Sequence, residues 1–199
     1  MFRGMMPVTR ALVLACGGGF LLQLLAREPL LIYGALWPLD RGADYAPFHL
    51  WQLVSYAFLH GGFVHLAFNM FGLYMFGSEI ERLLGTRRYL VYYVVCVIGA
   101  ALAQLAVWQL GSGAAGYTVG ASGGVMGLLL AFGLAYPQRK VMLLILPIPM
   151  PAWLFVTLYG LAELFQGVTG TLNGIAHFAH LGGMAAGFLL ILFWRVRRV

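Results

Sequence analysis

Long apolar stretches separated by short polar connections run through the whole chain. Six can be recognised, at approximately residues 9–26, 53–77, 89–110, 120–136, 141–166 and 175–194. Each has, or nearly has, the length that a helix needs to cross a hydrocarbon core of about 30 Å. The stretch at 120–136 is short, so we expect a helix that begins inside the membrane, below a water-filled cavity. The pattern predicts an all-α membrane protein with six transmembrane helices, one domain over residues 1–199 and a long first loop at 27–50.

Composition agrees with this prediction. The 199 residues are 62% hydrophobic and only 9% charged, and the mean hydropathy is +0.88. Soluble domains have about 25% charged residues, so a lipid bilayer is the expected surrounding. The net charge of +6 comes from short basic segments and forms no stripe, so a nucleic-acid partner is not expected. Cys16 and Cys96 both lie inside apolar stretches, and neither a disulfide nor a metal site is predicted.

The basic residues are distributed unequally between the two sides of the predicted bundle. Only Arg27 and Arg41, in the first loop, fall on one side. Ten fall on the other side: Arg3, Arg10, Arg82, Arg87, Arg88, Arg139, Lys140, Arg195, Arg197 and Arg198. Because basic residues concentrate in cytoplasmic segments, we expect both termini in the cytoplasm and the start of the 120–136 helix near the opposite face.

Two alternatives concern the beginning of the chain. The basic start and the stretch Val13–Cys16 partly resemble a lipoprotein signal peptide. Cleavage there would remove one span and spoil the even number of crossings, so we favour a retained helix. The first loop, with Pro29 and Trp37, either dips into the membrane interface or is a solvated connector, and the sequence favours neither.

A serine between glycines opens the short fourth stretch, in Gly120–Gly124. Serine is favoured at helix starts, and glycine lets the backbone turn sharply and another group approach closely. A helix N-terminus also favours developing negative charge. Ser122 is therefore a candidate nucleophile, although on the motif alone tight helix packing is the commoner explanation.

Polar residues recur in the second stretch. His65 and Asn69 are four residues apart and share one helix face, which must point to the bundle interior or to water. Both side chains can donate hydrogen bonds, as an oxyanion hole requires. The alternative is an interhelical hydrogen bond that only holds helices together. His60 falls on a different face and is expected to be structural.

The sixth stretch has a histidine before a pair of spaced glycines. Gly183 and Gly187 form a Gly-x-x-x-Gly spacing, and Gly120–Gly124 and Gly123–Gly127 repeat it on the serine helix. Such faces let helix backbones approach closely. If they meet, His180 is carried towards the serine, where a neutral imidazole would be a general base.

Two further polar residues lie near these positions. His177, one turn before His180, could be its neighbour or a supporting group. Glu163 is the carboxylate well inside an apolar stretch, with Gln166 nearby. It could be catalytic, protonated and packed, or hydrogen-bonded between helices, and we favour the structural roles. No acid stands out as a third partner of the serine and histidine.

Together these features resemble the rhomboid intramembrane serine proteases of the minimal six-helix bacterial kind. The resemblance extends from about Trp51 to Gly187. It is carried by four motifs: His60-x4-His65-x3-Asn69, Gly77 to Gly85 with Glu81, Gly120-x-Ser122-Gly123, and Ala179-His180-x-x-Gly183-x3-Gly187.

The resemblance implies a catalytic dyad without an acid, with Ser122 as nucleophile and His180 as base. It implies that His65 and Asn69 hold the oxyanion, together with backbone near the serine at Gly120 and Ala121. The expected activity is hydrolysis of peptide bonds in or near transmembrane segments of membrane-protein substrates, through an acyl-enzyme and without a cofactor or metal. The expected location is the bacterial inner membrane, with the active site opening to the periplasmic side.

The chain departs from the family at two positions. The first-loop Trp-Arg pair is Trp51-Gln52 here, and any role of the guanidinium is in doubt. Met126 stands where an aromatic side chain often stacks on the base. We expect Met126, His60, His177 and Gly183 to surround and support the serine and histidine. A non-catalytic helix-binding relative and a small transporter remain alternatives.

Overall fold

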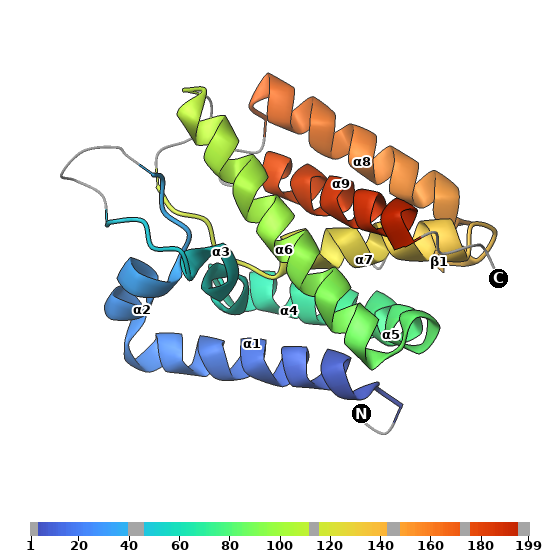
Figure 1. The fold of residues 1–199 in the computed structure, drawn as a ribbon, viewed down its shortest axis with the longest axis horizontal. Coiled ribbons are helices and arrows are strands. Elements are labelled where there is room, and N and C mark those ends of the chain that lie inside the picture. Colours follow the sequence, from blue (N-terminus) through green and yellow to red (C-terminus); the bar gives the residue numbers. More distant parts are fainter. Residues whose placement is uncertain (1–3, 40–45, 112–115, 143–147, 172–175, 195–199) are drawn as a thin grey trace.

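The computed structural model describes residues 4–39, 46–111, 116–142, 148–171 and 176–194, and most of them are helical (Figure 1). The longer helices are α1 (Pro7–Leu25), α4 (Phe63–Gly72), α6 (Thr86–Gln109), α7 (Ser122–Ala135), α8 (Ala152–Thr169) and α9 (His177–Trp194). The shorter ones are α2 (Arg27–Gly34), α3 (Gln52–Ser55), the 3-10 turn η1 (Tyr56–Phe58), the π-helix η2 (Leu73–Gly77) and α5 (Ser78–Leu84). Two strands, β1 (Lys140–Met142) and β2 (Pro149–Pro151), form an antiparallel hairpin.

Helices α6, α7 and α9 pack against one another at the centre of the bundle. In Figure 1, α1 lies along one side of this centre and α8 along the opposite side. Small residues permit the close packing: a Cβ on Gly182 of α9 would lie 2.7 Å from the carbonyl oxygen of Gly99 on α6. The two backbones therefore approach closely, with the small methyl groups of Ala103 and Ala186 packed beside the two glycines.

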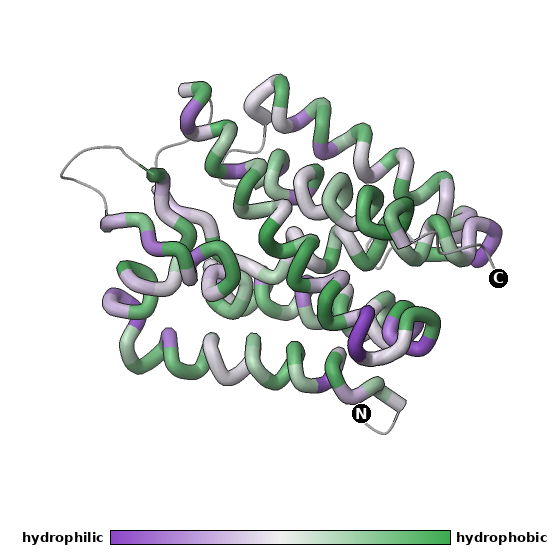
Figure 2. The backbone as a smooth tube through the Cα atoms, viewed as in Figure 1, coloured by the Kyte–Doolittle hydropathy of each residue, from purple (hydrophilic) through white to green (hydrophobic). Residues whose placement is uncertain are grey.

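The outer faces of the bundle are apolar, whereas several polar side chains are buried inside it. Exposed large hydrophobic residues follow α1, α8 and α9, among them Leu21, Leu24, Leu161, Phe165, Leu189 and Phe193. Figure 2 shows apolar residues along most of the length of these helices. Three of the described helices, α1, α6 and α9, are long and apolar enough to cross a membrane, and α7 is a shorter apolar helix. This distribution fits a protein whose solvent is lipid.

Four predicted segments agree with single helices to within a few residues: α1, α6, α7 and α9 correspond to 9–26, 89–110, 120–136 and 175–194. The second segment, 53–77, is wrong as one continuous helix. It is divided into α3, η1, α4 and η2, with the Gly61–Gly62 pair between η1 and α4. Glycine disfavours the helix interior, and a hydropathy pattern does not register such a break.

The fifth predicted segment, 141–166, also differs. Lys140–Met142 and Pro149–Pro151 are strands, and α8 begins only at Ala152. Residues 143–147 lie outside the described residues. Pro149 and Pro151 have no backbone N–H to donate to a helix, which explains the late start. The hairpin is an exception to the prediction of an all-α fold.

The described part of the first loop is structured. It contains α2, and Leu36 exchanges two backbone hydrogen bonds with Thr118, in the segment before α7. Gln52 is fully buried, accepts a hydrogen bond from the backbone of Trp37 at 3.3 Å and donates one to the carbonyl of Pro47 at 3.3 Å. The family that the sequence resembles has arginine at this position. Here Gln52 links the first loop to the bundle through these hydrogen bonds.

Candidate active site

Ser122 is the first residue of α7, as the sequence predicts. The turn before it is fixed by Gly120, whose N–H donates to the carbonyl of Tyr56 at 2.9 Å. Gly120 has φ +128°, and a Cβ there would lie 2.6 Å from Cε1 of His65. Only glycine satisfies both the backbone angle and this close approach. The turn thus places the serine directly beside the His65 ring.

The predicted contact between the glycine faces of α7 and α9 is confirmed. A Cβ on Gly183 would collide with the backbone of Gly123, and one on Gly127 would lie 3.3 Å from the Gly183 carbonyl oxygen. Gly187, in contrast, packs against the Tyr92 ring of α6. The contact of Gly183 with Gly123 therefore determines how closely α9 approaches the serine on α7.

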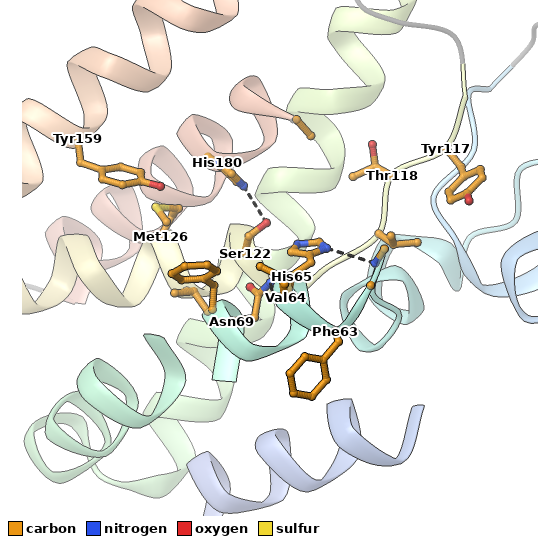
Figure 3. Close-up of a pocket in the computed structure, with 16 residues that line it drawn as sticks. Phe63, Val64, His65, Asn69, Tyr117, Thr118, Ser122, Met126, Tyr159 and His180 are labelled. Carbon is orange, nitrogen blue, oxygen red and sulfur yellow. Dashed lines mark hydrogen bonds between the residues drawn. The ribbon is translucent and has the colours of Figure 1, made fainter. Parts of the chain in front are cut away.

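This approach brings Ser122 and His180 together. Nε2 of His180 lies 2.8 Å from Oγ of Ser122 (Figure 3), so the predicted proximity is confirmed. The His180 side chain is buried and Ser122 is half-buried. The serine hydroxyl can donate to an unprotonated Nε2, which is the geometry that activates a nucleophile.

His65 and Asn69 lie on the same face of α4 and line the same pocket, as predicted. Nδ1 of His65 accepts a hydrogen bond from the N–H of Gly61 at 3.2 Å. A neutral ring that accepts at Nδ1 carries its proton on Nε2, and Nε2 is on the side of Gly120. One N–H of Asn69 donates to the His65 carbonyl at 2.9 Å, and its second N–H is left for another acceptor. Their role in holding an oxyanion stays a prediction.

These side chains surround a pocket of about 950 Å³ that opens to the exterior. Its polar lining includes His65, Asn69, Ser122, Tyr159 and His180. Its apolar lining includes Phe63, Val64, Phe68, Val125 and Met126. A mainly apolar wall with a few converging polar groups is typical of a binding site.

One residue that lines the pocket, Tyr159, was not predicted from the sequence. Tyr159 of α8 lines the pocket near Met126 (Figure 3). An aromatic ring therefore borders the site from another helix, although Met126 replaces the aromatic residue expected on α7. Nothing in the sequence pattern marked Tyr159, because its position depends on how α8 is rotated.

The carboxylate of Glu163 lies between the two histidines of α9. Its Oε2 is 2.6 Å from Nδ1 of His177, and its Oε1 is 3.0 Å from Nδ1 of His180. The second contact has ion-pair distance but not the alignment of a hydrogen bond. Sequence reasoning found no third partner for the serine and histidine, yet a carboxylate stands beside the base.

His60 supports His65 from outside the pocket. It is buried, and its ring packs edge-on against the His65 ring at a centroid distance of 5.3 Å. Its backbone N–H and C=O are both hydrogen-bonded to the side chain of Gln23 on α1. This arrangement agrees with the structural role that the sequence suggested. Among the described residues, no group of three or more His, Cys, Asp or Glu side chains is suited to hold a metal ion.

The fold and the pocket define a helical bundle with an apolar exterior and an internal serine–histidine pair. The sequence model of one family, described as the Rhomboid domain, matches residues 47–197. The chain therefore belongs to the rhomboid family.

Named relatives agree with this assignment. The rhomboid protease GlpG of Serratia proteamaculans is 31% identical over 192 residues, which cover 96% of this chain and 63% of the relative. GlpG of Yersinia pestis is 29% identical over the same shares. The mitochondrial rhomboid protein 1 of Saccharomyces cerevisiae is 32% identical over 139 residues, 69% of this chain and 40% of the relative. The chain thus spans less than two thirds of the length of these relatives.

Proposed function

We propose that this protein is an intramembrane serine endopeptidase that cleaves membrane-protein substrates in or near their transmembrane segments. The observation that carries the proposal is the 2.8 Å contact between Oγ of Ser122 and Nε2 of His180, at the edge of a pocket inside an apolar bundle. Membership of the rhomboid family supports the same conclusion, since GlpG relatives are named as proteases.

In the proposed reaction, Oγ of Ser122 attacks the scissile carbonyl carbon while Nε2 of His180 accepts the hydroxyl proton. The negative charge moves to the carbonyl oxygen. Donors for this oxyanion are Nε2–H of His65, the second N–H of Asn69 and the Ser122 N–H, which has no acceptor within the first turn of α7. His180 then protonates the departing amine, and an ester on Ser122 remains. A water molecule, deprotonated by His180, hydrolyses this ester and regenerates the serine.

The substrate must present an extended backbone to the serine. A helical segment hides each scissile carbonyl behind its own hydrogen bonds and side chains. The proposal therefore requires transmembrane segments that unwind locally, and the largely apolar pocket wall suits their side chains. No cofactor enters the reaction.

We also propose six membrane crossings with both termini in the cytoplasm, in a bacterial inner membrane. Several basic segments meet at one end of the bundle: Arg82 donates to the carbonyl of Gly4, and Arg139 pairs with Glu79 at 2.9 Å. The start of α1, α5 and β1 lie at this common end (Figure 1). The positive-inside rule makes this end cytoplasmic, so the Ser122 end would open to the periplasm.

Cleavage of a model transmembrane substrate by the purified protein in proteoliposomes tests the proposal. The Ser122→Ala variant is expected to lose at least about a thousandfold in kcat. Ser78→Ala is a matched control, because this buried hydroxyl lies on α5, outside the pocket, and accepts a hydrogen bond from the N–H of Met6 at 3.2 Å. Undiminished cleavage by Ser122→Ala would refute the proposed function. A wild-type protein that binds the substrate without cleaving it would be a non-catalytic helix-binding relative.

A further inference from the structure

The cluster of Glu163, His177 and His180 joins α8 to α9 directly behind the serine. All three side chains are buried: Glu163 is 5% exposed, His177 6% and His180 8%. One carboxylate thus contacts the Nδ1 atoms of two imidazoles, at 2.6 Å and 3.0 Å. The remaining ring nitrogen of His180 contacts Ser122.

Burial of an ionised carboxylate between α8 and α9 costs free energy unless partners offset it. The neighbours of Glu163 on α8, such as Leu161, Leu164 and Phe165, are exposed and apolar. Burying a carboxylate is expensive without a partner, and an ionisable residue that faces the interior of a membrane bundle is a candidate for function. The two imidazoles are partners that can donate hydrogen bonds and can also become charged.

The carboxylate favours one tautomer of His180. To accept the proton of Ser122, Nε2 must be unprotonated, and the ring proton must be on Nδ1. Nδ1 lies 3.0 Å from Oε1 of Glu163, so a proton there faces a negative charge. The contact is not yet aligned as a hydrogen bond, and such contacts often tighten only when substrate binds.

His177 holds the carboxylate in place. Its Nδ1 contacts the other oxygen, Oε2, at 2.6 Å. With one oxygen bound to His177, the second is directed at His180. The other polar groups near His180 come from other positions: Ser122 on α7, His65 on α4 and Tyr159 on α8. None of these three side chains is a carboxylate, so Glu163 is the group that supplies the negative charge beside His180.

We propose that Glu163 is a positioning residue for His180, and that His177 orients Glu163. This inference rests on the proposed function. Glu163 keeps the proton of neutral His180 on Nδ1 and stabilises the imidazolium that forms when Nε2 takes the proton of Ser122. The carboxylate stays ionised throughout, so no proton passes to it. The serine and histidine thereby have an acidic partner supplied by the neighbouring helix.

Steady-state cleavage by Glu163→Gln and Glu163→Asp tests the proposal. Glu163→Gln keeps the size but removes the charge, and we expect kcat to fall about a hundredfold with KM unchanged. Glu163→Asp keeps the charge on a shorter side chain, and we expect it to recover about tenfold of that loss. His177→Asn, which leaves Glu163 without its second partner, should lower kcat less than Glu163→Gln does.

The matched control is Glu81→Gln, the same change at a second carboxylate that is buried among the described residues. It should lower the thermal unfolding midpoint in detergent and leave kcat and KM unchanged. The inference is overturned if Glu163→Gln keeps kcat within twofold of wild type, or if Glu163→Asp is no better than Glu163→Gln. Should Glu163→Gln fail to fold, Glu163→Asp and His177→Asn decide together, and wild-type kcat values for both would overturn the inference.

These outcomes are separable from those of the proposed function. Cleavage that survives Ser122→Ala would remove the protease assignment itself. If Ser122→Ala is inactive while Glu163→Gln is fully active, the protease assignment stands and only the role of Glu163 is lost.

Discussion

Two buried carboxylates in this bundle have different partners. Glu81 accepts hydrogen bonds from the N–H groups of Val8 and Thr9, at 3.0 and 2.8 Å, and from the Thr9 hydroxyl at 2.8 Å. It therefore caps the first turn of α1, which has no capping side chain of its own. Glu163 faces two imidazoles instead. Peptide N–H groups and hydroxyls keep their charge state, whereas an imidazole can gain a proton.

The comparison distinguishes a carboxylate that stabilises the fold, Glu81, from one that we propose assists the reaction, Glu163. A carboxylate that accepts hydrogen bonds from neutral, fixed groups stabilises the native structure equally at all stages of a catalytic cycle. An acid beside an imidazole can interact more strongly when that ring becomes charged, which lowers the energy of the charged state. Substitutions near Glu81 should therefore change stability, and substitutions near Glu163 should change turnover.

The largest effect is expected from His180→Ala. Without the imidazole, Ser122 has no base, and kcat should fall about 10³- to 10⁴-fold. The thermal unfolding midpoint in detergent should also fall, because a buried ring is removed and Glu163 keeps His177 alone of its two imidazole partners, so kcat is compared per folded molecule. Substrate cleavage and thermal unfolding are measured together, with His49→Ala as the control outside the pocket. Retention of more than a tenth of the wild-type kcat would show that His180 is not the base.

Next in size is His65→Ala, which removes the proposed Nε2–H donor to the oxyanion. Loss of one such donor costs about 10²- to 10³-fold in kcat. His65→Gln, whose amide can still donate, should lose less. If His65→Ala raised KM and left kcat unchanged, His65 would bind substrate without stabilising the transition state.

Gly183→Ala tests how the site is assembled. The new methyl group would collide with the backbone of Gly123, and such overpacking costs about 2 to 3 kcal/mol. The free energy of unfolding and the reactivity of Ser122 should both fall, because α7 and α9 must separate. Gly160→Ala on α8 is the matched control, since its methyl group would meet only Met184, at an ordinary 3.5 Å. Equal stability for the two variants would argue against the glycine contact.

Glu81→Gln should have the smallest effect, and it should fall on stability alone. Val8 donates to one carboxylate oxygen and Thr9 to the other, whereas glutamine has one oxygen and an NH2 group that cannot accept. One of these buried donors therefore loses its acceptor, at a cost of about 2 kcal/mol. Chemical unfolding in detergent measures this cost, and kcat per folded molecule should match the wild type. A large fall in kcat would remove the distinction between the two carboxylates.

The sequence predicted the serine–histidine contact because its determinants are local. Ser122 follows from helix-start chemistry, and the spacing of Gly123 and Gly183 relative to the two polar residues fixes which faces can meet. The position of Glu163 depends on the rotation of α8 against α9, which no local pattern encodes. For the same reason, the contact between Glu163 and His177 appeared only in the structure.

Segment boundaries were predicted less well where hydropathy and backbone chemistry disagree. Residues 141–151 are apolar enough for a helix, but Pro149 and Pro151 prevent one and a strand forms. The 53–77 stretch is apolar throughout, yet it is interrupted at Gly61–Gly62. Gln52 could be identified as a departure from the family, but its hydrogen bonds to the first loop could be seen only in the structure.

The most direct test of the central claim is the rate at which a fluorophosphonate labels Ser122, measured by mass spectrometry of the peptide that carries it. The serine–histidine account predicts labelling at Ser122 in the wild type and a rate about a thousandfold lower in His180→Ala. Equal rates in the two proteins, or a label on a different residue, would contradict it.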